Sequence, residues 1–355
     1  MTTALPEGAA LPAGIPRART LAVRFALGAL VFAVVVVVLA GKRGDLLASL
    51  RRLTQLRPLW VAVALAAEAA AVAAFTLLQR RALRATGVGA PWLGGLLVSM
   101  ASNAIASSVP GEPVVSSAYR YRCYRRWGST AAGAGWTIFV VLVSQSIGMS
   151  ALLLVGILVA VATGAGSVGT GAAALAAVVI ALAGAVLARR DLLLRVLGAG
   201  VAASRRLTGR PRRDLADRID RALRRMREIP LGPTATLELA GLGALMWTCD
   251  CLCLAASFRA IGAAVPWDGL LVAYGAAQIV SSIPVVPGGF GLVEGSLSVI
   301  LVAYGVGHVP AVSVTLMFRL VTFWLAIAAG WCAAGVLALA ERRERPVSEV
   351  ASATE

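Results

Sequence analysis

Long apolar stretches recur along the chain, and several exceed the roughly 20 residues that a helix needs to cross a bilayer. They occupy residues 25–41, 58–78, 92–109, 131–160, 171–188, 235–258, 269–306 and 311–338. The stretches are continuous rather than alternating, which predicts helices and not an outer-membrane barrel. Hydrophobic residues make up 59% of the chain and charged residues 14%. The sequence therefore predicts an all-α, polytopic membrane protein with about 6–8 transmembrane helices.

Basic residues are distributed unevenly around these stretches. The chain carries 33 Lys and Arg against 17 Asp and Glu, and the segment 189–228 contains thirteen arginines and five acids. Arginine-rich loops remain in the cytoplasm and face anionic lipid, so the basic excess indicates a membrane partner rather than a nucleic acid. Counting spans outward from this loop puts both termini in the cytoplasm, which predicts a multi-pass protein of the cell inner membrane.

The apolar stretches and the basic loop divide the chain into two membrane halves. We expect a cytoplasmic N-terminal tail at 1–20, a first half at 21–188, an Arg-rich cytoplasmic loop at 189–232, a second half at 233–340 and a cytoplasmic tail at 341–355.

Each half contains one stretch that proline and glycine interrupt, at Pro110-Gly111 within 92–119 and at Pro284-Val285-Val286-Pro287-Gly288-Gly289 within 269–306. Proline removes a backbone donor and clashes with the preceding turn. Broken backbone at membrane depth persists only where protein buries it or where it lines a wet cavity. We interpret 92–119 as a re-entrant hairpin that enters from the cytoplasm. For 269–306, a second re-entrant hairpin and two full spans fit equally well.

The two breaks share a short signature, because Ser107-Ser108-Val109-Pro110 matches Ser281-Ser282-Ile283-Pro284. A span, a broken hairpin and a second span describe both halves, in opposite membrane orientation. Inverted repeats with paired broken helices point to a transport site near the middle of the membrane. The alternative is a chance similarity between short runs of small and apolar residues.

Charged residues inside apolar stretches need a reason, because each costs about 2.5–3.5 kcal/mol at mid-membrane. Glu112 and Glu294 lie at the breaks, and Arg319 lies well inside the last stretch. Arg319 either binds a lipid phosphate or pairs with one of the two glutamates. The alternative is an ion pair that only holds the hairpins in place. For Glu68, Glu238 and Asp250, which no break accompanies, we expect helix-packing or helix-end roles.

The segment Gly288-Gly289-Phe290-Gly291 leads into a helix that begins at Leu292. Its glycines allow close backbone approach, and the positive end of a helix suits an anionic headgroup. A plain flexible hinge is the alternative.

Catalytic and metal-binding patterns are not evident in the sequence. His308 is the only histidine. Cys249 and Cys253 share one face of a helix while Cys251 points nearly opposite, so three small buried hydrophobes fit better than a metal cluster. We expect no catalytic residue, metal or cofactor.

Two motifs give the chain a family resemblance. The segment from Pro284-Val285-Val286-Pro287-Gly288-Gly289-Phe290-Gly291 to Glu294, followed by Phe318-Arg319-Leu320 and Ala329-Gly330-Trp331, resembles the flippase-like membrane domain of lysylphosphatidylglycerol synthases. The segment from Asn103 through Glu112 to the Arg120 cluster is similar to the first motif of that family. The resemblance covers about residues 20–340 and includes stand-alone membrane proteins of unassigned function.

The resemblance implies a protein that handles lipids. Its expected partner is an anionic phospholipid or a polyprenyl-linked lipid, which the protein would translocate. Lipid aminoacylation is not expected, because the soluble aminoacyl-transferase domain of two-part members does not follow the membrane part here. The alternative is a non-transporting membrane partner of a glycosyltransferase or lipid-modifying enzyme. The residues expected to bind lipid or substrate are Pro110, Gly111, Glu112, Arg120, Pro284, Pro287, Gly288, Gly289, Gly291, Glu294 and Arg319.

The arginine count yields a test of orientation. With the five native cysteines replaced by serine, Arg210→Cys should react with a thiol reagent only after the membrane is permeabilised, because the basic loop is expected in the cytoplasm. Labelling in intact cells with an impermeant maleimide checks this. Reaction at residue 210 from outside would reverse the predicted topology.

Overall fold

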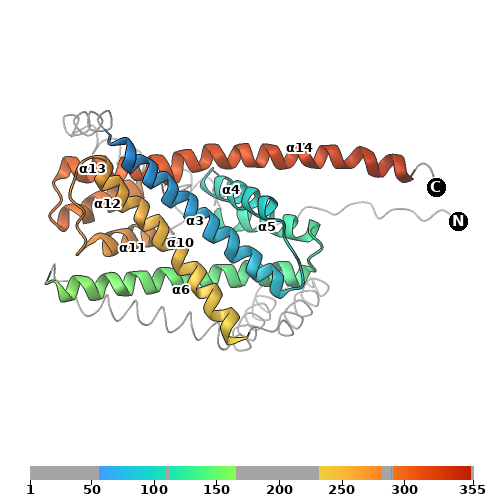
Figure 1. The fold of residues 1–355 in the computed structure, drawn as a ribbon, viewed down its shortest axis with the longest axis horizontal. Helices are drawn as coiled ribbons and strands as arrows, with labels where there is room; N and C mark the ends of the chain where they lie inside the picture. The colour runs from blue at the N-terminus through green and yellow to red at the C-terminus, as the bar shows by residue number, and fades with distance from the viewer. Residues whose placement is uncertain (1–55, 109–111, 165–231, 282–288, 290, 353–355) are drawn as a thin grey trace, which may run out of the picture.

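A computed structural model describes residues 56–108, 112–164, 232–281, 289 and 291–352. Every regular element in these ranges is a helix (Figure 1), which confirms the predicted all-α class. The predicted apolar stretches at 25–41 and 171–188, the tail at 1–20 and most of the Arg-rich loop at 189–232 lie outside the described residues.

Four of the described helical segments are long and apolar enough to cross a membrane. They are α3 (Pro58–Ala85), α6 (Ala131–Ala162), α10 (Pro233–Ala260) and a continuous segment, His308–Ala340. The last segment combines α13 (His308–Arg319), the π-helix η2 (Leu320–Leu325) and the first part of α14 (Ala326–Ser352). Both α3 and α10 have 28 residues and so extend about 42 Å, beyond the roughly 30 Å of a hydrocarbon core.

Two pairs of shorter helices occur where the sequence predicts breaks. The first hairpin consists of α4 (Trp92–Ser108) and α5 (Glu112–Arg126), and the second of α11 (Leu270–Ser281) and α12 (Leu292–Ala303). The two helices of each pair pack against each other. At 12 residues each, α11 and α12 extend about 18 Å, which is too short to cross a hydrocarbon core. For α12, which Gly291 and Tyr304 cap at its two ends, this length favours a re-entrant helix over a full span.

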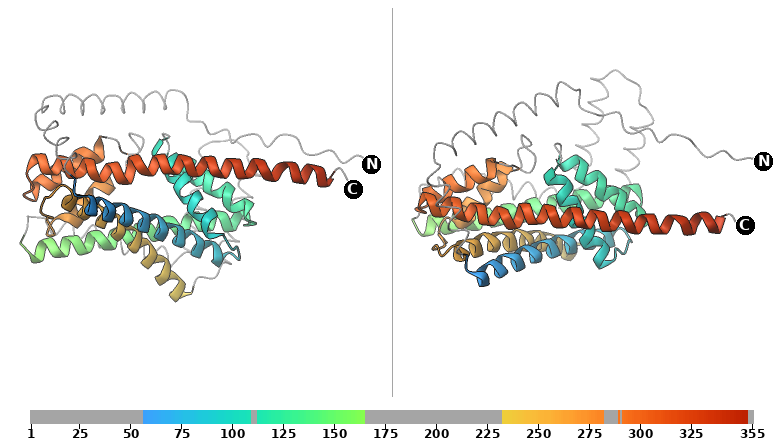
Figure 2. Two further views of the ribbon diagram at one scale, coloured as in Figure 1. Left: turned by 45° about the horizontal axis from the view of Figure 1, so that its top comes forward. Right: turned by 90° about the horizontal axis from the view of Figure 1, so that it is seen from above.

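The hairpins pack reciprocally on the long helices. α3 and α10 pack together through the middle of the molecule, with the first hairpin toward one end and the second toward the other (Figures 1 and 2). α4 of the first hairpin packs on α14, which belongs to the second half of the chain. α11 of the second hairpin packs on α6, which belongs to the first half. This exchange is the arrangement that two related halves around a shared axis would produce.

Glycines permit the closest of these helix contacts. A Cβ atom on Gly330 of α14 would lie 2.4 Å from the Met100 carbonyl oxygen of α4, and one on Gly156 of α6 would lie 2.6 Å from Cβ of Leu271 on α11. Where α6 crosses α10, a Cβ on Gly148 would lie 2.4 Å from the Gly243 carbonyl carbon. Small residues allow this approach, which supplies the van der Waals packing that holds helices together in lipid.

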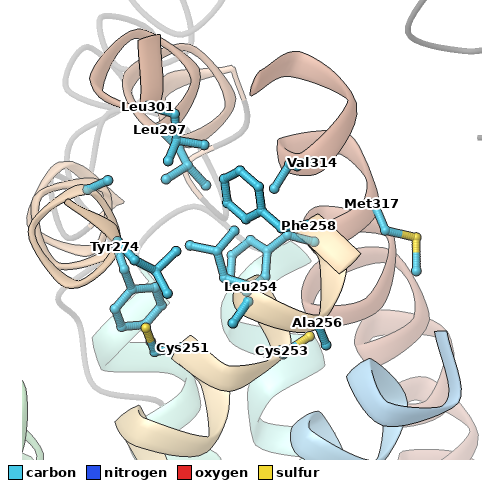
Figure 3. Close-up of a cluster of buried hydrophobic side chains, with 14 of the residues drawn as sticks. Cys251, Cys253, Leu254, Ala256, Phe258, Tyr274, Leu297, Leu301, Val314 and Met317 are labelled. Carbon is cyan, nitrogen blue, oxygen red and sulfur yellow. The ribbon is translucent and has the colours of Figure 1, made fainter. Parts of the chain in front are cut away.

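A large hydrophobic cluster joins the second hairpin to α10 and α13. Its buried side chains include Leu254 and Phe258 of α10, Tyr274 of α11, Leu297 and Leu301 of α12, and Val314 and Met317 of α13 (Figure 3). The second hairpin is therefore enclosed by protein on this side, as broken backbone in a membrane requires.

The helix crossing provides a test of packing. A Cβ on Gly243 would lie 2.3 Å from the backbone oxygen of Ser144, whereas one on Gly241, two residues earlier on α10, would meet nothing within 4 Å. Gly243→Ala should cost about 1–3 kcal/mol by overpacking. Gly241→Ala should leave thermal stability in detergent unchanged or slightly raised, since alanine suits a helix better than glycine. Equal melting temperatures for the two variants would contradict the close contact between α6 and α10 at Gly243.

Candidate functional site

The second hairpin turns through two glycines whose backbone few other residues could adopt. Gly289 has a φ of 63° and Gly291 a φ of 82°, both in the left-handed region. Gly289 is also buried, and a Cβ there would lie 2.9 Å from a side-chain methyl of Val293. The turn into α12 thus depends on glycine at both positions. Both are among the predicted substrate-binding residues; the structure shows a backbone role for each, and substrate binding stays a prediction.

Glu294 connects the start of α12 to α13. One carboxylate oxygen, Oε2, accepts a hydrogen bond of 2.6 Å from the backbone N–H of Gly291. The other, Oε1, lies 2.6 Å from Nε of Arg319. The side chains are 20% and 10% exposed. Glu294 therefore satisfies an N–H at a helix start inside the protein and neutralises a buried arginine.

Arg319 is the last residue of α13 and directly precedes the π-helix η2. Its guanidinium carbon lies 3.9 Å from the ring centroid of Phe323, one turn further on. Cation–π contact and the ion pair together fix the guanidinium beside the second hairpin. π-helices are rare and occur frequently at functional sites. The sequence gives no sign of this one, because Leu320–Leu325 contains neither proline nor glycine.

A second polar cluster lies where α3, α10 and α11 meet. The carboxyl groups of Glu68 on α3 and Asp250 on α10 interact directly. Tyr274 of α11 donates a 2.5 Å hydrogen bond from its hydroxyl to Asp250 Oδ2, and Gln278 Nε2 lies 3.4 Å from the same hydroxyl. The other oxygen, Asp250 Oδ1, is buried without a hydrogen-bond partner among the described residues. We call Glu68 and Asp250 the acid pair.

The first hairpin has its own buried polar network. Ser99 of α4 accepts hydrogen bonds from Thr76 (2.9 Å) and Gln79 (2.8 Å) of α3. Tyr124 of α5 donates to the side-chain oxygen of Gln79. All four side chains are buried, so the network ties both helices of the first hairpin to α3.

Arg120 of α5 lies close to this network. Its guanidinium carbon is 5.8 Å from the Phe75 ring centroid, and Nη2 donates a weak 3.4 Å hydrogen bond to Ser117. Its Nε is buried without a partner among the described residues. Burial lowers the pKa of Arg120, and the neighbouring Tyr124 opposes that shift. An anion would satisfy both the buried donor and the charge.

The structure brings only some predicted site residues together. Gly291, Glu294 and Arg319 form one cluster, and Arg120 lies in another, beside the first hairpin. Glu112 is the first residue of α5, but its side chain is outside the described part of the chain. The remaining predicted residues, Pro110, Gly111, Pro284, Pro287 and Gly288, lie outside the described residues.

The other charges and cysteines have packing positions. Glu238 pairs with Arg81 at 2.5 Å, joining α10 to α3. Cys251 and Cys253 are both buried, because α10 is surrounded by α3, α6, α11 and α13. Glu68 and Asp250 also lie between α3 and α10, and the sequence does not predict their interaction. The available signal for this interaction was that each acid lies in an unbroken apolar stretch. The sequence does not show that the two stretches pack together and bring the acids close.

The last helix contains the remaining motif of the family resemblance, Ala329-Gly330-Trp331. Gly330 lets α4 approach α14, and the indole N–H of Trp331 donates a 3.2 Å hydrogen bond to Ser108 at the end of α4. The same continuous helical segment holds the second hairpin through Arg319. One helix therefore contacts both hairpins next to their breaks.

Long apolar helices, two short hairpins and buried ionic clusters define a polytopic helical membrane protein. A family model described as the lysylphosphatidylglycerol synthase TM region matches residues 24–330, and the chain belongs to this family.

Two relatives carry the description UPF0104 membrane protein. The one from Methanothermobacter thermautotrophicus is 32% identical over 89 residues, which is 25% of this chain and 27% of the relative. The one from Pyrococcus horikoshii is 33% identical over 99 residues, which is 28% of each chain. The matched segment thus spans only about a quarter of these relatives.

The two ion pairs permit a matched stability test. Glu294→Gln should destabilise the protein by about 3–5 kcal/mol, because it leaves Arg319 buried without its carboxylate. Glu238→Gln should cost about 0–1 kcal/mol, since the Arg81–Glu238 pair is 36% and 53% exposed. Denaturant unfolding in detergent measures both variants. A similar loss for the two would mean that Glu294 is not the anchor of the second hairpin.

Proposed function

We propose that this chain is a lipid flippase-like protein that translocates a phospholipid or lipid-linked intermediate across the membrane. The pair formed by Arg319 and Glu294 beside the broken helix carries the proposal. A buried charge in a membrane protein is costly and belongs by default to a pathway or binding site. The expected substrate part is an anionic headgroup, because Arg319 is the cation of this site.

The geometry at Arg319 suits exchange between two anionic partners. Glu294 contacts the guanidinium through Nε, and guanidinium presents five donors in a planar fork that matches phosphate. In the resting protein, Glu294 neutralises the arginine. A headgroup phosphate that reached the site would share or replace that contact, while Glu294 kept its hydrogen bond to the α12 backbone.

Arg120 is proposed as a second headgroup contact, in the other half of the molecule. It has a buried donor without a partner in the described chain, and its guanidinium faces Phe75. An arginine beside each hairpin would allow a headgroup to pass from one half of the molecule to the other. The family relationship supports lipid as the substrate class, since the family description refers to the membrane region of a phospholipid synthase.

Lipid movement by the purified chain tests this function. In liposomes that contain a fluorescent anionic phospholipid, the chain should make inner-leaflet lipid accessible to an impermeant quencher. Arg319→Leu should abolish the movement, and Arg319→Lys should slow it, since lysine keeps the charge but lacks the fork. Arg120→Ala should also slow it. The matched controls are Arg81→Lys and Arg122→Ala; the Arg81 side chain is 36% exposed, and Arg122 lies at an exposed position.

The outcomes separate the two candidate functions. A folded Arg319→Leu protein that moves lipid like the wild type would refute the assigned role of Arg319. A wild-type protein that moves neither anionic phospholipid nor a polyprenyl phosphate, but co-purifies with a glycosyltransferase or lipid-modifying enzyme, would support the non-transporting alternative.

A further inference from the structure

The acid pair contains more negative charge than the described neighbours neutralise. In the described part of the chain, the cation that acts on this region is Arg319, whose Nε contacts Glu294. Arg319 also acts on Asp250 through its charge, while Tyr274 donates a hydrogen bond to Asp250 Oδ2. Two adjacent ionised carboxylates in a low-dielectric site repel each other strongly, so one of the two retains a proton.

The hydrogen-bond pattern indicates where that proton lies. Asp250 Oδ2 accepts from the Tyr274 hydroxyl, whereas Oδ1 is buried and has no donor in the described chain. A protonated Glu68 would be such a donor, because its carboxyl group interacts directly with that of Asp250. One shared proton would therefore remove the repulsion and also satisfy the unpartnered oxygen.

The described parts of the surrounding helices carry few other titratable groups near the acid pair. The elements packed on α10 contribute Glu68 from α3, Tyr274 from α11 and Arg319 from α13, and α6 contains no charged residue. Glu294 of α12 is occupied by Arg319 and Gly291. On α10 itself, Cys249, Cys251 and Cys253 flank Asp250. His308 is exposed at the start of α13.

We propose that Glu68 and Asp250 form a proton-binding site that couples lipid movement to a proton gradient. The coupling, though not the proton site, rests on the proposed lipid transport. Asp250 lies within electrostatic reach of Arg319. Without the proton, the doubly charged acid pair would compete with Glu294 and with a headgroup for the Arg319 guanidinium. With the proton bound, this competition would end, and Arg319 would interact with Glu294 and with a headgroup. A proton and an anionic headgroup would thus favour the same state of the site.

Infrared spectroscopy tests the proton site without any transport. The wild-type protein at neutral pH should show the carbonyl stretch of a protonated carboxylic acid. That band should disappear in Glu68→Gln and in Asp250→Asn, and should persist in the control Glu238→Gln. Absence of the band from the wild type, or its persistence in both acid-pair variants, would overturn the proposal. Stabilisation by sodium without the band would also overturn it, in favour of a metal cation.

Transport under an imposed pH difference tests the coupling. The wild-type rate of lipid movement should change by up to about tenfold per pH unit, because one proton is exchanged. Glu68→Gln and Asp250→Asn, which are fixed in the neutral form, should lose this response, while Glu238→Gln should retain it. A wild-type rate of lipid movement that does not change with the pH difference would refute the coupling but not lipid transport. An infrared band without any lipid movement would refute the transport and the coupling together.

Discussion

A helix that begins or ends inside a membrane leaves backbone groups that lipid cannot satisfy, and protein must supply the missing partners. At the second hairpin, Glu294 does this for the N–H of Gly291 and uses its other oxygen to hold Arg319. The same side chain thus supports the broken backbone and balances the buried cation. A break in α11–α12 without Glu294 would remove this carboxylate from both groups, so the hairpin and the ionic cluster depend on each other.

The reciprocal packing extends this dependence to the whole molecule. Each hairpin rests on a long helix of the other half, and glycine makes both contacts close. The segment from α13 to α14 contacts the second hairpin through Arg319 and the first through Gly330 and Trp331. A shift of this segment would therefore displace its contacts at both breaks. The π-helix between Arg319 and α14 is the place where such a shift could be absorbed, because its wider turn departs from the regular helical ladder.

The sequence predicted the features that proline, glycine and charge make visible. The helical membrane class, the two interrupted stretches and the need of Glu294 and Arg319 for a partner all follow from residues that are costly in lipid. The acid pair escaped prediction because Glu68 and Asp250 are 182 positions apart (250 minus 68) and no break accompanies either. Only the packing of α3 on α10 makes them neighbours. The π-helix escaped because its residues are ordinary helix formers in lipid.

The ion pair need not be only structural or only functional, and its geometry explains why. A buried arginine without an anion would be severely destabilising, so a transport site built on arginine needs a resident carboxylate in the resting state. That carboxylate must remain satisfied when a phosphate takes its place. Glu294 meets this condition, because Oε2 is already held by the Gly291 N–H and only Oε1 contacts Arg319. A structural pair uses this division to hold the hairpin, and the same division would let Arg319 turn to a headgroup phosphate while Glu294 keeps its hydrogen bond to Gly291, as the proposed transport requires.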